Sequence, residues 1–141
     1  MNYSVFLDED KIGVSELENA DVPNRVIFGY INFVNKSFDY HFFSDYCKTN
    51  SVKATESSEY KFILTPKIPG LKVCNENGIE IKGFGCSIGG TDSEGFEVYV
   101  SGVPDSFLET EFSHHVKNYN EKFGWKIRLP KLRATTTANS G

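Results

Sequence analysis

The chain has 141 residues, with 15 lysine and arginine residues against 19 aspartate and glutamate residues, a formal net charge of −4 and an aromatic content of 14%. Its length corresponds to one ordinary domain, which buries roughly two-thirds of the surface of the unfolded chain. The aromatic content and the mixed charges exclude an intrinsically disordered chain, a collagen-like repeat and a coiled coil. A membrane-spanning helix is also excluded, because the longest uncharged apolar stretch, Val26–Val34, has about half the necessary length.

The amino-terminal sequence and the cysteines both favour a cytoplasmic location. The first residues contain no basic segment and Asp8 interrupts their apolar run, so we expect no secretory signal. Cys47, Cys74 and Cys86 are odd in number and far apart in the sequence, which fits neither a disulfide framework nor a Cys-x-x-Cys unit. We therefore expect a cytoplasmic protein with free thiols and with no bound metal or cofactor.

The first half of the chain contains three predicted strands. Asn2–Leu7 alternates apolar and polar residues, and Arg25–Val34 is rich in the β-branched and aromatic residues that strands favour. Between these two strands, the polar residues 13–24 are expected to form a loop or one short helical turn. A second aromatic run, Phe38–Tyr46, is predicted to be the antiparallel partner strand of Arg25–Val34. The polar residues 48–58 are predicted to form a loop.

Further strands are predicted where apolar runs lie between turn residues: Glu59–Thr65, Leu71–Cys74, Ile79–Gly83 and Gly95–Val103. The dipeptide Asn77 and Gly78, between the second and third of these segments, is a strong signal for a hairpin turn. In the last segment Glu97 and Tyr99 alternate with apolar residues, which is the pattern of a half-buried strand.

A long helix is predicted from Ser106 to Phe123. Ser106 and Glu109 have the spacing of a capping box, in which the two side chains bond to backbone amides at the start of a helix. Apolar residues recur every three or four positions and form one stripe, which consists of Leu108, Phe112, Val116, Tyr119 and Phe123.

After this helix, Trp125–Leu129 is predicted to be a closing strand, and residues 134–141 lack large apolar side chains and are predicted to be a disordered tail. No internal repeat or linker divides residues 1–133. The whole pattern predicts one α+β domain over residues 1–133, with a mostly antiparallel sheet and the long C-terminal helix packed on one face.

One motif resembles a catalytic sequence. Residues 85–89, Gly-Cys-Ser-Ile-Gly, match the Gly-x-Ser-x-Gly nucleophile elbow of serine hydrolases, with Ser87 as the nucleophile. Asp92 or Asp105 followed by His114 would complete the order Ser–Asp–His. The elbow needs a sharp turn from a strand into a helix, whereas loop-forming residues follow here, so we favour a glycine-rich hairpin loop. A small serine hydrolase that uses Ser87 remains the alternative hypothesis; Cys86 is a weaker candidate, because no neighbouring cation lowers its thiol pKa.

The histidines and the basic residues provide weaker signals. His114 and His115 are adjacent on the predicted helix, so their rings point about 100° apart and do not converge on one metal ion. We expect His115 at the boundary of the apolar stripe. Residues 117–141 carry six basic side chains against Glu121, but the nearby aromatic residues are needed for the core and the whole chain is acidic. We therefore expect no nucleic-acid partner.

Two segments are candidates for a partner-binding surface. Residues 1–23 carry six acidic side chains against Lys11 alone. The aromatic run Phe38–Tyr46, as a strand, would place large rings on both faces, and exposed rings are typical interface anchors. The predicted partner-binding residues are Asp8, Glu9, Asp10, Glu16, Glu18, Tyr40, Phe43 and Tyr46.

With the acidic cluster Asp8-Glu9-Asp10 and the aromatic run Phe38–Tyr46, the chain resembles in general character the small cytoplasmic immunity proteins that bacteria pair with secreted toxins, such as those of contact-dependent inhibition. The resemblance is one of class over the whole chain and involves no shared motif, so it assigns no role to any residue. It implies a non-catalytic protein that binds and neutralises a protein partner, such as a basic toxin domain, without contact with a membrane.

Overall fold

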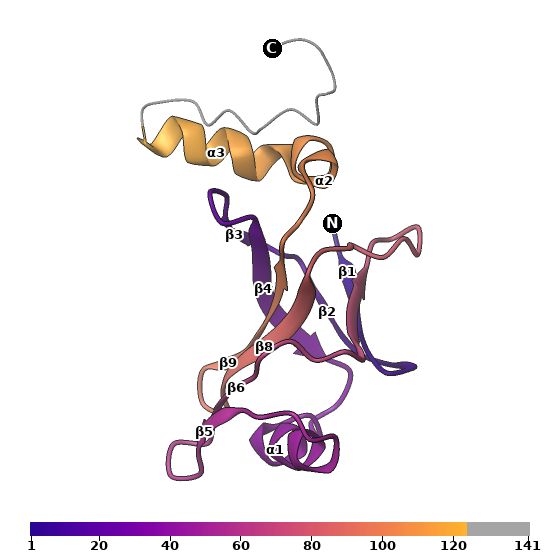
Figure 1. The fold of residues 1–141 in the computed structure, drawn as a ribbon, viewed down its shortest axis with the longest axis vertical. Coiled ribbons are helices and arrows are strands. Elements are labelled where there is room, and N and C mark those ends of the chain that lie inside the picture. Colours follow the sequence, from indigo (N-terminus) through magenta and orange to yellow (C-terminus); the bar gives the residue numbers. More distant parts are fainter. Residues whose placement is uncertain (124–141) are drawn as a thin grey trace.

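A computed structural model describes residues 1–123; the predicted strand Trp125–Leu129 and the predicted tail at residues 134–141 lie outside this range. The described chain forms one nine-stranded antiparallel sheet and three short helices (Figure 1). The strands are β1 (Tyr3–Leu7), β2 (Asp10–Ser15), β3 (Asn19–Asp21), β4 (Val26–Phe33), β5 (Thr55–Ser57), β6 (Phe62–Leu64), β7 (Leu71–Cys74), β8 (Gly85–Thr91) and β9 (Gly95–Ser101). The helices are α1 (Tyr40–Thr49), α2 (Asp105–Glu109) and α3 (Ser113–Phe123).

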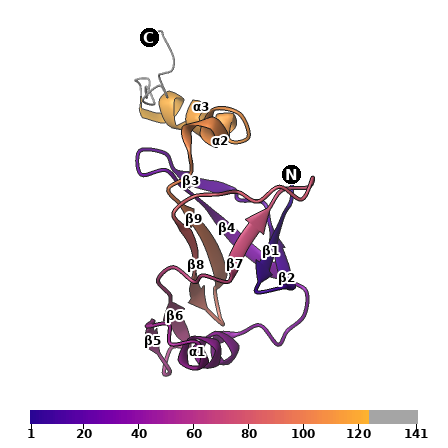
Figure 2. The same ribbon diagram turned by 45° about the vertical axis from the view of Figure 1, so that its right-hand side comes forward.

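The sheet has the strand order β5–β6–β8–β9–β4–β2–β1–β7, and β3 pairs with β4 beside β2. It curls so that β7 returns toward β8, and the amide of Ile68, between β6 and β7, donates a hydrogen bond of 2.9 Å to the Cys86 carbonyl in β8. Side chains from distant strands, such as Val5, Ile27 and Val98, are fully buried in one apolar cluster. The core therefore lies inside the curl, and Figures 1 and 2 show helices at its two ends.

The strands predicted from β-branched and aromatic runs are confirmed, with shifted ends. Asn2–Leu7 contains β1, Arg25–Val34 contains β4 and Gly95–Val103 contains β9. Glu59–Thr65 and Leu71–Cys74 likewise correspond to β6 and β7. The second strand of the predicted hairpin, Ile79–Gly83, is reduced to a single bridge between Cys74 and Glu80.

The aromatic run Phe38–Tyr46 forms helix α1, so its prediction as a strand was wrong. Asp39 begins this helix as its N-cap, and its carboxylate accepts a hydrogen bond of 2.9 Å from the amide of Phe42. The Asp92 carboxylate, in the turn after β8, accepts a second bond of 2.8 Å from the amide of Tyr40. These two carboxylates satisfy amide groups that a helix start leaves without partners.

The buried face of α1 explains why the rings favour a helix here. Tyr40, Phe43 and Cys47 recur at helical spacing and are all buried against the sheet. The Phe43 ring is fully buried, and its centroid lies 5.5 Å from that of Phe96 in β9. Burial of this face closes one end of the curl, shown at the bottom of Figure 1.

The predicted α+β fold with one long C-terminal helix was also wrong, because α2 and α3 are separate short helices on a mostly β domain. The Thr110 hydroxyl donates to the Ser106 carbonyl, an acceptor that a continuing helix would use for a backbone amide. Pro104, rather than Ser106, is the N-cap of α2 and makes no side-chain cap bond. The two helices close the end of the curl opposite α1 (Figure 1).

Residues 13–24, predicted as a loop or a helical turn, contain the second half of β2 and all of β3. Between these strands Leu17 has a positive φ of 45°, and the Glu18 carboxylate accepts a hydrogen bond of 3.0 Å from the amide of Tyr30 in β4. A side-chain oxygen thus replaces a backbone carbonyl where the ladder is interrupted. The facing residue, Gly29, must be small, because a Cβ atom there would lie 2.9 Å from the Cα atom of Leu17. Part of the predicted loop 48–58 likewise forms β5.

Candidate functional site

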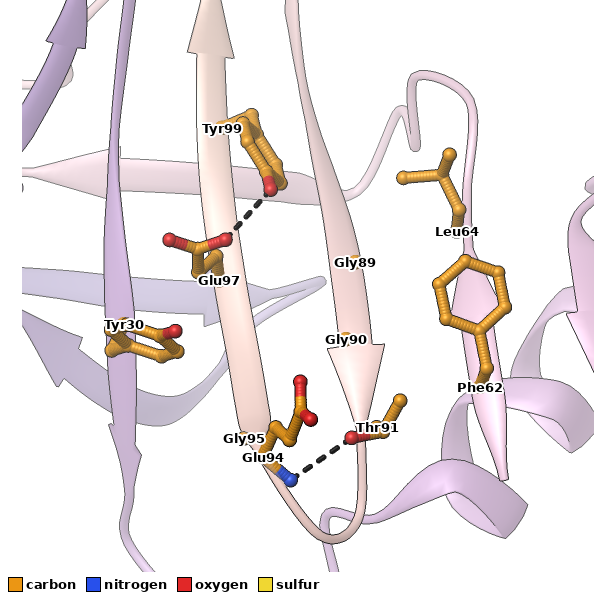
Figure 3. A pocket seen from close by; sticks show the side chains of 10 residues that line it. All are labelled: Tyr30, Phe62, Leu64, Gly89, Gly90, Thr91, Glu94, Gly95, Glu97 and Tyr99. Atoms are coloured by element: carbon orange, nitrogen blue, oxygen red, sulfur yellow. Dashed lines mark hydrogen bonds between the residues drawn. The ribbon is translucent and has the colours of Figure 1, made fainter. Parts of the chain in front are cut away.

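A hollow of about 360 Å³ lies on the outer face of the sheet and crosses β4, β9, β8 and β6 (Figure 3). In the register of the sheet, Tyr30 lies opposite Glu97, Glu97 opposite Gly89, and Gly89 opposite Leu64. The hollow is lined by Tyr30, Phe62, Leu64, Gly89, Gly90, Thr91, Glu94, Gly95, Glu97 and Tyr99. The four residues paired in this register form one row across the outer face of the sheet. Because Gly89 has no side chain, this row has a gap between Glu97 and Leu64.

The walls of the hollow are aromatic and aliphatic. Tyr30 stands on one side, and Phe62 and Leu64 stand on the other (Figure 3). Tyr30 is 50% exposed and Leu64 is 45% exposed, so large apolar surfaces face water on both sides. Apolar surface gathered on one face of a domain is typical of a binding site.

Glycines form the floor of the hollow, and the backbone requires one of them directly. Gly90 has a φ of +154°, and a Cβ atom at this position would lie 2.7 Å from the Cα atom of Phe96. Gly95, the first residue of β9 after the turn, also has a positive φ, of 94°. Side chains are therefore excluded at the turn end of the floor by the conformation of the hairpin itself.

Glu97 is held in a fixed orientation within the hollow. The Tyr99 hydroxyl donates a hydrogen bond of 2.8 Å to Oε1 of Glu97. The Tyr99 ring stacks on Phe28 of β4, with ring centroids 5.1 Å apart. Burial and the neighbouring carboxylate raise the pKa of Tyr99 to about 12, so its phenol keeps the proton that it donates. Glu94 adds a second carboxylate to the hollow.

The chemistry of this hollow favours a cationic group. A carboxylate supplies charge and hydrogen-bond acceptors, and the faces of aromatic rings attract cations within about 6 Å. The lining residues include two glutamates and neither lysine nor arginine. The arrangement can therefore bind a positively charged side chain or small molecule.

The predicted acidic residues fall into two groups. All five side chains are exposed to solvent. Asp8 and Glu18 also form hydrogen bonds within the fold, because the Tyr46 hydroxyl donates to Asp8 Oδ2 at 3.1 Å and Glu18 accepts from the β4 backbone. Glu9, Asp10 and Glu16 are therefore the stronger candidates for contact with a partner.

The predicted aromatic anchors lie mainly in the core. Tyr40 and Phe43 are buried on α1, and Tyr46 is only partly exposed beside Asp8. The exposed aromatic surface comes from the outer face of the sheet instead, and sequence reasoning did not single out that face as a site. The available signal was the alternation in β9, which points Glu97 and Tyr99 away from the core.

Ser87 lies in the middle of strand β8, opposite Tyr99 of β9. The strand-to-helix turn of a nucleophile elbow is therefore not formed around it. The glycine-rich hairpin loop expected at residues 85–89 was also wrong, because these residues belong to β8. Within residues 1–123, no hydrogen bond joins the Ser87 hydroxyl to a histidine. Burial raises the pKa of the neighbouring Cys86 thiol to about 11, which keeps it protonated at neutral pH.

The histidines lie elsewhere in the fold. His115, expected at the boundary of an apolar stripe, is buried, and its Nε2 atom lies 2.8 Å from the Leu17 carbonyl oxygen. Burial lowers its pKa below the usual value of 6.5. Among the described residues, no three His, Cys, Asp or Glu side chains are grouped as metal ligands. The rings of Tyr119 and Phe123, which are among the aromatic residues near the basic segment 117–141, pack on each other with centroids 4.5 Å apart.

Within the part of the chain that the structure describes, no helix has the length and apolar character needed to cross a membrane. No family model, curated protein or solved structure matches the chain. Functional assignment therefore depends on the geometry of the chain itself.

Proposed function

We propose that this chain is a non-catalytic, cytoplasmic interaction protein that binds and neutralises a basic protein partner, as an immunity protein blocks a toxin. One observation carries the proposal: exposed and half-buried apolar side chains flank two carboxylates on the outer face of the sheet. Tyr30, Phe62 and Leu64 supply the apolar surface, and Glu94 and Glu97 supply the charge.

The combination of apolar and acidic surface supports a protein partner in two ways. Tyrosine and phenylalanine are enriched in protein interfaces, and tyrosine is among the residues that most often supply a large share of the binding energy. Carboxylates around such a patch speed association with a basic partner and select against acidic ones. The exposed Glu9 and Asp10 and the net charge of −4 add to this long-range attraction.

The proposal is tested by capture from the native host on the immobilised full chain. We expect one basic protein to be retained, with an association rate that falls steeply as salt concentration rises. Expressed alone, that protein should inhibit growth, and co-expression of this chain should relieve the inhibition.

Two variants make the test specific to the face. Tyr30→Ala should weaken capture at least tenfold, because it removes a half-exposed ring from the patch. Phe84→Ala removes an 80% exposed ring beside the start of β8, at the opposite end of that strand, and should leave capture unchanged. Capture of no basic protein, or a partner whose inhibition of growth is not relieved, would contradict the proposal.

A further inference from the structure

We infer that the hollow is a receptor for the guanidinium group of an arginine side chain, with Glu97 as its counter-ion. The identity of the arginine as part of a basic protein depends on the function proposed above. The binding of guanidinium by the hollow is a separate physical property, which can be measured without the partner.

Charge complementarity gives the first argument. The ten residues that line the hollow include Glu94 and Glu97 and no basic residue. A further carboxylate, that of Glu18, accepts a hydrogen bond from the backbone amide of the lining residue Tyr30. Apolar walls reduce the screening of these charges by water, so a cation in the hollow is attracted more strongly than one on an open surface.

The orientation of Glu97 gives the second argument. Tyr99 uses Oε1 of this carboxylate, and no described residue donates a hydrogen bond to Oε2. Tyr99 is itself fixed by its stack on Phe28, so the carboxylate is oriented before any ligand arrives. A guanidinium presents paired N–H donors in a plane that matches a carboxylate, and preorganisation lowers the cost of pairing them.

The shape of the hollow favours arginine over lysine. Tyr30 and Phe62 place aromatic rings on opposite sides of the space above the glycine floor (Figure 3). A flat guanidinium can stack on the Tyr30 ring and still pair with the neighbouring Glu97 carboxylate at its edge, whereas a lysine ammonium is a compact, strongly hydrated charge. The volume of about 360 Å³ falls in the range of pockets that hold small ligands.

The inference is tested by titrating the isotope-labelled full chain with N-acetyl-arginine methylamide and recording amide chemical shifts by NMR. The matched probe is N-acetyl-citrulline methylamide, which has nearly the same shape and no charge. We expect the arginine probe to shift amides in residues 89–97 and around Tyr30, and the citrulline probe to leave them in place. N-acetyl-lysine methylamide should bind several-fold more weakly than the arginine probe.

Two variants locate the binding site. Glu97→Gln removes the charge and should weaken arginine binding at least tenfold. Glu109→Gln removes the same charge from an exposed position on α2, at one end of the curl, and should change binding less than twofold. Gly89→Ala tests the site independently, because its methyl group fills part of the floor of the hollow and leaves Glu97 and Tyr99 unchanged. The one close contact of its Cβ atom would be the flexible end of Leu64, at 2.8 Å, and the next nearest atom, of Tyr99, would lie at an ordinary 3.6 Å, so the variant should fold and still bind more weakly.

The outcomes separate the two proposals. Arginine binding at the hollow without any basic partner in the capture experiment would support the receptor and contradict the proposed function. Capture of a basic partner without an arginine response would overturn the receptor and leave the proposed function standing. An equal response to citrulline, or to Glu97→Gln and Glu109→Gln, would also overturn the receptor.

Discussion

His115 and Leu17 are 98 positions apart in the sequence and are joined by a hydrogen bond of 2.8 Å between Nε2 and the carbonyl oxygen. The bond fastens α3 to the interruption between β2 and β3. The same interruption places the Glu18 carboxylate on the amide of Tyr30, a residue that lines the hollow. The helix at one end of the sheet is thus connected through a few residues to the edge of the candidate site.

The buried His115 predicts a loss of stability in mildly acidic solution. Burial, with a smaller contribution from His114, lowers its pKa below 6.5 in the folded state. As pH falls from about 7 through 6.5 to the lower pKa of His115 in the folded state, the unfolded chain binds more protons than the folded one. The free energy of unfolding therefore decreases over that pH range. Urea unfolding at several pH values between 7.5 and 5.5 measures this slope.

His115→Gln should flatten the slope, whatever its effect on absolute stability, because glutamine does not titrate. The neighbouring His114 is exposed and makes only the smaller contribution to the lowered pKa of His115, so His114→Gln should reduce the slope only in part. A slope that survives His115→Gln would show that other groups cause it.

The capping of α1 predicts a specific cost at Asp39. Asp39→Ala removes the carboxylate that accepts the Phe42 amide, and N-cap losses of this kind cost about 1 kcal/mol. Asp45 is an exposed residue inside the same helix, and Asp45→Ala should be neutral or slightly stabilising, since alanine favours helices. Denaturant unfolding measures both; equal destabilisation by the two substitutions would argue against the cap.

The hairpin turn between β1 and β2 predicts different roles for two adjacent acids. Asp8 has a positive φ of 57°, and it accepts the Tyr46 hydroxyl at 3.1 Å, so Asp8→Ala should destabilise the fold by about 1–2 kcal/mol. Glu9 is exposed and is expected to act only on a partner, so Glu9→Ala should leave the thermal melt nearly unchanged. A substantial melting shift for Glu9→Ala would assign that side chain to the fold as well.

The position of Ser87 predicts the result of a test for serine hydrolase activity. Its hydroxyl is not hydrogen-bonded to an imidazole in the described structure, so nothing there activates it as a nucleophile. We expect a fluorophosphonate probe to label the original chain no more strongly than it labels Ser87→Ala. A thermal melt checks that both proteins are folded. Labelling that disappears in Ser87→Ala would revive the hydrolase hypothesis.

The sequence predicted strands correctly where the whole signal lies within one short segment. Arg25–Val34 and Gly95–Val103 combine β-branched residues with alternation, and both contain strands of the sheet. The prediction was wrong for Phe38–Tyr46, because strand propensity describes individual aromatic residues, whereas burial and capping act on the whole segment. The helical spacing of Tyr40 and Phe43, preceded by the cap at Asp39, was the contrary signal.

The remaining errors come from contacts between residues that are distant in the sequence. Ser15 and Glu18 are polar, yet they complete the interruption between β2 and β3 because Gly29 opens space beside them. The outer-face hollow likewise depends on strand order, which brings Tyr30 and Leu64 into one row although 34 positions separate them. Local patterns contain no information about such pairing.

The alternation of β9 has a consequence for how this protein can evolve. Phe96, Val98 and Val100 fill the interior, while Glu97 and Tyr99 face outward. The proposed recognition of a partner can therefore change by exchange of outward residues, without repacking the interior that keeps the chain folded.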